Sequence, residues 1–198
     1  MIRCFIAIEL DVQLRAAIAE VQRRVRSMVE KAAGREARMQ WVRPEAIHVT
    51  IKFLGDVEEG QVGEIRKALA RVATSCHPGS VDVAGLGVFP DLRNPRVLWV
   101  GLQGGAPLVV GLAEAVDRAL ADEGFLPENR PFSPHLTLAR IKEGGRAVGR
   151  ALEATGALNE SAVVGTLPIR AVAFMKSELH PSGSVYTRLA EFPLGAAG

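Results

Sequence analysis

Two histidines in this sequence are each followed, two positions later, by a threonine. The first pair is His48 and Thr50, and the second is His135 and Thr137. Aliphatic residues fill the positions between and after them in both copies, and such alternation is typical of a half-buried β-strand. Alternate side chains of a strand point to the same face. Each copy therefore presents an imidazole and a hydroxyl side by side.

This pair of motifs is suited to chemistry at phosphorus. If the two strands face one cleft, the imidazoles approach a bound group from opposite sides, as in-line displacement requires of a base and an acid. An imidazole can fill either role because its unperturbed pKa is about 6.5. The threonine hydroxyls can donate to non-bridging phosphate oxygens. We therefore predict His48 and His135 as catalytic residues, and the scheme requires no metal or cofactor.

The rest of the chain must supply the elements that hold these strands. Apolar periodicity predicts helices over 11–33, 58–73, 107–123 and 146–155, and strands over 2–10, 48–55, 81–89, 96–102, 135–140, 169–179 and 185–192.

Short turns join several of the strands directly, which favours antiparallel pairing. Together with the repeat, they predict an α+β fold of two pseudo-symmetric lobes, each an antiparallel sheet with outer helices, flanking a central cleft. The length of 198 residues fits a single domain, 1–198, of two intimately packed lobes. We expect its last residues, 195–198, to fray.

Composition narrows the function. The formal net charge is only +2, which does not indicate non-specific electrostatic binding to duplex nucleic acid. Two cysteines without CxxC spacing, no signal-peptide pattern and no long apolar run predict a cytoplasmic protein that does not contact a membrane. Near-neutral charge and a single lobe pair predict a monomer. The sequence contains no HExxH, GxxxxGK[ST] or GxSxG motif, which argues against metal hydrolysis, triphosphate-driven ligation and a serine nucleophile.

Several segments resemble the 2H phosphoesterases, a family named for two His-x-Thr motifs. The branch they are most similar to is the RNA 2′,3′-cyclic phosphodiesterases, also called 2′-5′ RNA ligases. The resemblance runs from about residue 2 to 190 and is carried by 3–8, Trp41, 48–55, 87–90, 96–101 and 132–140. It implies metal-independent hydrolysis of an RNA-terminal 2′,3′-cyclic phosphate to a 2′-phosphate, with weak reverse ligation. The implied partners are RNA ends, including tRNA fragments, or nucleoside 2′,3′-cyclic phosphates.

The resemblance also implies roles for individual residues. His48 corresponds to the acid that protonates the leaving 3′ oxygen, and His135 to the base that activates water, although the duplication makes the two chemically equivalent. Thr50 and Thr137 correspond to phosphate ligands. Arg140 matches a basic residue of the second motif that contacts phosphate or base.

Three positions near the motifs keep alternatives open. Arg140 should face away from His135 on a regular strand, so a role at the site requires a bulge or a strand end, and the alternative is a solvated surface arginine. Phe5 is a candidate to stack on a nucleobase, with core packing as the alternative. Lys52 has the parity to share a face with His48, but a flanking charge is more often simply exposed.

Two other classes of function compete with the enzyme. A catalytically quiet module that binds nucleotides or RNA ends can use the same cleft, although binding alone does not need an acid–base pair. A structural domain whose repeated strands merely pack is the other alternative.

Overall fold

The computed structural model describes residues 1–159, 163–180 and 183–195, and its strands form one nine-stranded antiparallel sheet. The strands are β1 (Ile2–Glu9), β2 (Arg38–Trp41), β3 (His48–Val57), β4 (Gly79–Phe89), β5 (Val97–Gln103), β6 (His135–Glu143), β7 (Val163–Ile169), β8 (Ala171–His180) and β9 (Gly183–Pro193). The helices are α1 (Val12–Ala33), α2 (Val62–Ser75), α3 (Ala106–Ala121) and α4 (Gly145–Thr155). The strand order is β7-β4-β5-β6-β3-β1-β8-β9, and β2 pairs with β6 beside this path.

The sheet consists of two halves that meet between β6 and β3. A single residue pair, Val49 and Leu136, joins these two strands, whereas every other neighbouring pair along the path shares four or more residue pairs. One half contains, from the junction to the edge, β6, β5, β4 and β7, and the other contains β3, β1, β8 and β9. The strands of the two halves correspond to each other in this order. The α+β fold of two lobes with antiparallel sheets is therefore confirmed.

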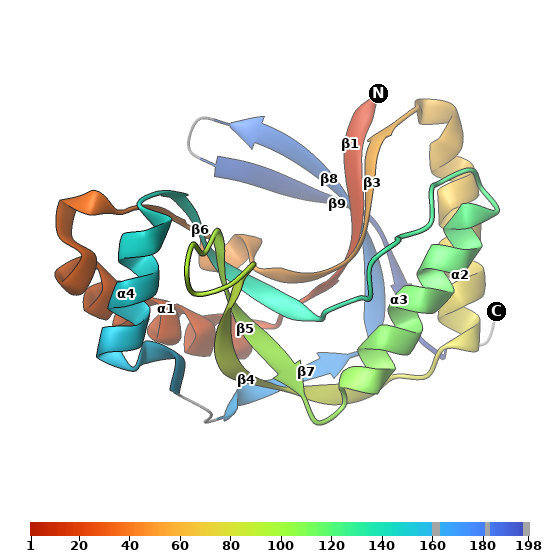
Figure 1. The fold of residues 1–198 in the computed structure, drawn as a ribbon. Helices are drawn as coiled ribbons and strands as arrows, with labels where there is room; N and C mark the ends of the chain where they lie inside the picture. Colours follow the sequence, from red (N-terminus) through yellow and green to blue (C-terminus); the bar gives the residue numbers. More distant parts are fainter. Residues whose placement is uncertain (160–162, 181–182, 196–198) are drawn as a thin grey trace.

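The helices cover the two halves in pairs (Figure 1). Helices α1 and α4 pack together next to β7, and α2 and α3 pack together against β3, β8 and β9. Helix α1 begins where the Asp11 carboxylate accepts a hydrogen bond from the Leu14 N–H at 2.8 Å, and it ends at Gly34, whose φ of 58° favours glycine. Its apolar stripe, which includes Ile18 and Val25, is buried.

One predicted strand is in fact two. The predicted strand 169–179 begins at Ala171, and Ile169 instead ends β7, which the sequence analysis missed. The chain changes partners at Arg170: β7 pairs with β4 at one edge of the sheet, while β8 pairs with β1 and β9 in the other half. No Gly or Pro at position 170 signals this change.

Of the tail 195–198 that was predicted to fray, the structure describes only Gly195. Gly195 donates its N–H to the carbonyl oxygen of Ala73 at 2.9 Å, which ties it to the end of α2. Residues 196–198 lie outside the described residues.

Candidate active site

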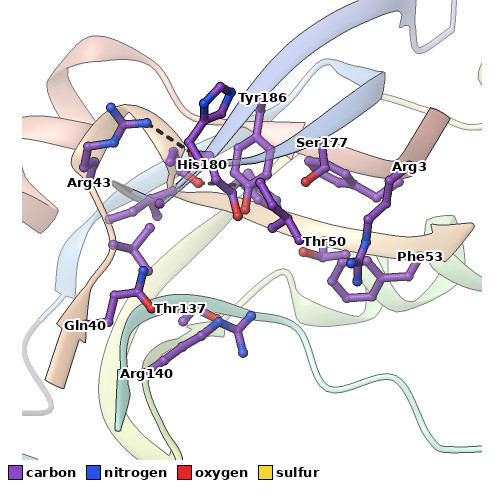
Figure 2. Close-up of a pocket in the computed structure, with 18 of the residues that line it drawn as sticks. Arg3, Gln40, Arg43, Thr50, Phe53, Thr137, Arg140, Ser177, His180 and Tyr186 are labelled. Atoms are coloured by element: carbon purple, nitrogen blue, oxygen red, sulfur yellow. Dashed lines mark hydrogen bonds between the residues drawn. The ribbon is translucent and has the colours of Figure 1, made fainter. Parts of the chain in front are cut away.

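The junction between the two halves brings the repeated motifs together. The antiparallel Val49–Leu136 pair sets His48 across from Thr137 and Thr50 across from His135. All four side chains line one pocket of about 480 Å³. Figure 2 shows Thr50 and Thr137 in this pocket. Val49 and Leu136, on the opposite face, are fully buried. The two motifs therefore share one cleft, as the sequence predicted.

Both imidazoles are held in the same way. Nδ1 of His48 lies 2.9 Å from the carbonyl oxygen of Ala46, and Nδ1 of His135 lies 2.7 Å from that of Ser133. A carbonyl can only accept, so each Nδ1 carries the proton and donates it. In the neutral ring this leaves Nε2 with a free lone pair. Each ring can therefore take up or release a proton at Nε2.

Aromatic rings pack around both histidines. The ring centroid of His48 lies 4.8 Å from Phe5 and 5.1 Å from Tyr186, while that of His135 lies 5.0 Å from Phe89. Ring packing on two sides restricts the rotation of His48 and removes water from around it. Tyr186 also lines the pocket and was not predicted, because nothing near it in the sequence resembles either motif.

The pKa of His48 is lowered to about 4, mainly by burial and to a smaller extent by the nearby Arg140 and His135, while the hydrogen bond to Ala46 acts in the opposite direction. With the cleft empty, His48 is therefore neutral at physiological pH. A bound anion would act in the opposite direction and raise the pKa of His48.

The same β-bulge occurs in both motif strands. In the pairing of β3 with β1, Thr50 lies opposite Ala7 and Lys52 lies opposite Ile6, so Ile51 has no partner. In the pairing of β6 with β5, Leu138 is left without a partner in the same way. Each skipped residue lies three positions after its histidine. The bulge reverses the parity of the strand beyond it.

This reversal decides where the next side chains point. Arg140, five positions after His135, turns into the pocket, so the bulge that its role required is present. Phe53, five positions after His48, enters the pocket in the same way and was missed by the sequence analysis.

Lys52 turns the other way, so the parity argument for it was wrong. It is only 6% exposed, forms an ion pair with Asp117 of α3 and donates to the Leu126 carbonyl oxygen at 2.8 Å. The alternative of a simply exposed charge is excluded as well. Lys52 instead ties β3 to α3 and to the loop that precedes β6.

Phe5 reaches the site but is only 2% exposed. Its ring contacts His48 and Tyr186, and almost none of its surface is open to a ligand. Its burial supports the packing role that the sequence analysis left open over the stacking role.

The pocket lining is positively charged. Arg3, Arg43, Arg140 and Lys142 line it, together with His180, and no Asp or Glu is among its lining residues in the described chain. Because the molecule as a whole has a formal net charge of only +2, this concentration of cations is local. It favours an anionic ligand.

The described residues contain neither a group of candidate metal ligands nor a candidate membrane-spanning helix. There, no cluster of three or more His, Cys, Asp or Glu side chains is arranged to hold a metal ion. Nor is any helix of the described chain both long and apolar enough to cross a membrane.

A duplicated antiparallel sheet that directs two imidazoles into one basic pocket defines a phosphoesterase of the two-histidine class. Residues 10–99 and 102–186 match the profile of the family described as LigT like Phosphoesterase. The chain therefore belongs to the LigT-like phosphoesterases, the 2H family that its motifs predicted.

Similar proteins agree with this assignment. An RNA 2′,3′-cyclic phosphodiesterase of Aquifex aeolicus is 36% identical over 180 residues, covering 90% of this chain and 92% of the relative. The crystal structure of a Thermus thermophilus protein has a TM-score of 0.74 and 26% identity, with 99% of this chain and 100% of that chain covered. E. coli LigT complexed with 3′-AMP has a TM-score of 0.73 at 20% identity, covering 98% of each chain, and supports the fold.

Proposed function

We propose that this protein hydrolyses RNA-terminal 2′,3′-cyclic phosphates to 2′-phosphates, using His48 and His135 as an acid–base pair. The observation that carries the proposal is the pair of imidazoles in one basic pocket, each with Nδ1 held by a carbonyl and Nε2 free. The curated relative named RNA 2′,3′-cyclic phosphodiesterase supports the same reaction.

The reaction requires two proton transfers. A water oxygen attacks phosphorus and gives its proton to Nε2 of His135, while the bond from phosphorus to the 3′ oxygen breaks and this oxygen takes a proton from Nε2 of His48. Thr50 and Thr137 donate to the non-bridging oxygens, whose negative charge grows in the transition state. Arg140 supplies a positive charge beside the phosphate. If a 5′-hydroxyl replaces water as the attacking group, the same two proton transfers form a 2′-5′ linkage as the 3′ oxygen leaves.

The role of His48 as the acid imposes a condition. The ring has a pKa of about 4 when the cleft is empty, so it must gain its proton when the anionic phosphate binds. If the phosphate does not raise the pKa of His48, the two histidines exchange roles in this scheme.

The test is an assay with a nucleoside 2′,3′-cyclic phosphate in the presence of chelator, using wild type, His48→Ala and His135→Ala. We expect wild type to form the 2′-phosphate, and each variant to lose about 10² to 10⁴-fold in kcat, as removal of general acid–base catalysis does. His77→Ala is the matched control, because His77 is exposed and lies outside the pocket.

The result also separates the competing functions. Full activity in both variants would rule out the acid–base mechanism. Binding of the nucleotide by wild type without turnover would instead favour the catalytically quiet module.

A further inference from the structure

The loop between α3 and β6 carries the carbonyl that holds His135, yet little of this loop is buried. It spans residues 122–134, and Figure 1 shows it crossing from the end of α3 past β3 to the start of β6. Residues 126–131 are all exposed, with Leu126 at 88%. Of the loop residues, Phe125 and Phe132 pack against the apolar core, and they flank this exposed stretch. Apolar packing therefore does not fix the middle of the loop.

Polar contacts from Lys52 and Asp117 fix it instead. Nζ of Lys52 donates to the carbonyl oxygen of Leu126 at 2.8 Å. The two carboxylate oxygens of Asp117 accept the N–H of Glu128, at 3.2 and 3.3 Å. The ion pair between Lys52 and Asp117 joins these contacts into one cluster. The exposed stretch is thus attached to β3 and α3 through two of its own backbone groups.

The chain between this attachment and His135 is stiff. Pro127, Pro131 and Pro134 lie along it, and each proline fixes its own φ and restricts the preceding residue to an extended backbone. Ser133 precedes Pro134, and its carbonyl oxygen lies 2.7 Å from Nδ1 of His135. A displacement of the loop at its attachment should therefore reach this carbonyl.

Stability of the core does not account for a lysine at position 52. Its side chain is only 6% exposed, and a buried ion pair often contributes no more to stability than apolar side chains of similar size. The second motif shows the apolar solution. Ala139 follows His135 by four positions, as Lys52 follows His48, and Ala139 is fully buried. The charge is present in the motif whose side chain reaches the loop.

We propose that Lys52 and Asp117 are positioning residues for His135. They hold the loop so that the Ser133 carbonyl keeps a proton on Nδ1 of His135, which leaves Nε2 free to take the proton of the attacking water. This inference rests on the proposed function. It makes the strand of one motif responsible for the orientation of the histidine in the other.

The test reads the tautomer of each histidine by NMR of the ring nitrogens at pH 8, where an imidazole with the ordinary pKa of about 6.5 is neutral. Lys52→Met keeps a long side chain but cannot donate. We expect His135 to change from its Nδ1–H form to a mixture with the Nε2–H form. His48 should keep its Nδ1–H form, because its partner Ala46 lies outside the loop. An unchanged His135, or an equal change in both rings, would overturn the proposal.

Kinetics give a second readout of the same variant. Lys52→Met should lower kcat for a nucleoside 2′,3′-cyclic phosphate by about tenfold to a hundredfold, with little change in KM, because a misoriented base costs reactivity more than binding. A loss confined to KM would contradict a role through His135.

Two further variants separate the loss of the attachment from a failure to fold. Lys52→Met combined with Asp117→Leu replaces the ion pair by apolar side chains, which buried sites tolerate, and it should show the same change at His135. Asp117→Asn retains an oxygen that can accept the Glu128 N–H, so it should keep most of the wild-type kcat and the Nδ1–H form of His135. A wild-type His135 tautomer in the double variant would count against the proposal.

Val116→Ala is the matched structural control. Val116 is fully buried in the same turn of α3, so this substitution should lower the free energy of unfolding while it leaves the polar contacts in place. We expect an unchanged kcat and an unchanged His135 tautomer. A change at His135 as large as that in Lys52→Met would indicate general loosening and overturn the proposal. Failure of the proposed function is a separate outcome, in which wild type hydrolyses no cyclic phosphate while the tautomer comparison still reports on Lys52.

Discussion

At the scale of single residues, the environment of His48 is what makes the site sensitive to charge. Its ring packs against Phe5 and Tyr186, and burial there is the main cause of its low pKa. Arg140 adds a smaller effect in the same direction. Since an anion opposes both effects, the protonation of His48 should report directly on whether phosphate occupies the pocket.

This leads to a prediction about Arg140. In Arg140→Gln the positive charge is removed, so the pKa of His48 should rise from about 4 towards its ordinary value. The measurement is an NMR titration of the His48 ring signals in wild type and variant. Sulfate, which does not titrate in this range, should also raise the pKa of His48 in wild type. An unchanged value in the variant would show that Arg140 does not act on this ring.

At the scale of elements, the bulge of β6 is held by helix α1 as well as by the neighbouring strands. Gln22 of α1 is 6% exposed, and its Nε2 donates to the carbonyl oxygens of Leu138 at 2.9 Å and Val42 at 2.8 Å. Leu138 is the bulged residue of β6, and its carbonyl also accepts the Val42 N–H. The side chain of Gln22 therefore holds the bulge that turns Arg140 into the pocket.

We predict that Gln22→Met weakens this bulge. Methionine has a similar size but cannot donate, so two largely buried carbonyls lose a hydrogen bond and the free energy of unfolding should fall by about 1–3 kcal/mol. Urea denaturation measures this loss. Compared with wild type, Gln22→Met should raise KM for a cyclic phosphate. In a protein that already carries Arg140→Gln, adding Gln22→Met should leave KM unchanged. A full additional rise in the double variant would indicate that Gln22 does not act through Arg140.

At the scale of the whole molecule, the helices bind the two halves to each other. Helix α1 follows β1 but packs with α4 and β7 of the other half, and α3 follows β5 but packs with α2 and β3. Each half is therefore covered in part by a helix that follows a strand of the other half. We propose that residues 1–198 form one domain that folds as a unit and is a monomer.

At this scale we expect cooperative unfolding whose free energy depends on pH. Urea unfolding should show one transition, and the free energy of unfolding should fall as the pH drops from 6.5 through 4. The sign follows because the pKa of His48 is lowered in the folded state, so the unfolded chain binds more protons in this window. A shift from 6.5 to about 4 corresponds to about 3 kcal/mol at the low-pH limit.

His48→Gln should remove this part of the pH dependence, while His77→Gln, at an exposed position, should leave it in place. Two separate urea transitions would contradict a single cooperative domain.

The sequence by itself determined what depends on local periodicity. Alternation within each strand placed His48 with Thr50 and His135 with Thr137, and the apolar stripe of α1 was readable at helical spacing. The tertiary structure alone decided what depends on pairing between distant segments. The bulges at Ile51 and Leu138 arise from register with β1 and β5, so they alone sent Phe53 and Arg140 into the pocket and Lys52 to Asp117. Parity along a strand is a local property, whereas a bulge is a property of two strands, which is why one could be predicted and the other could not.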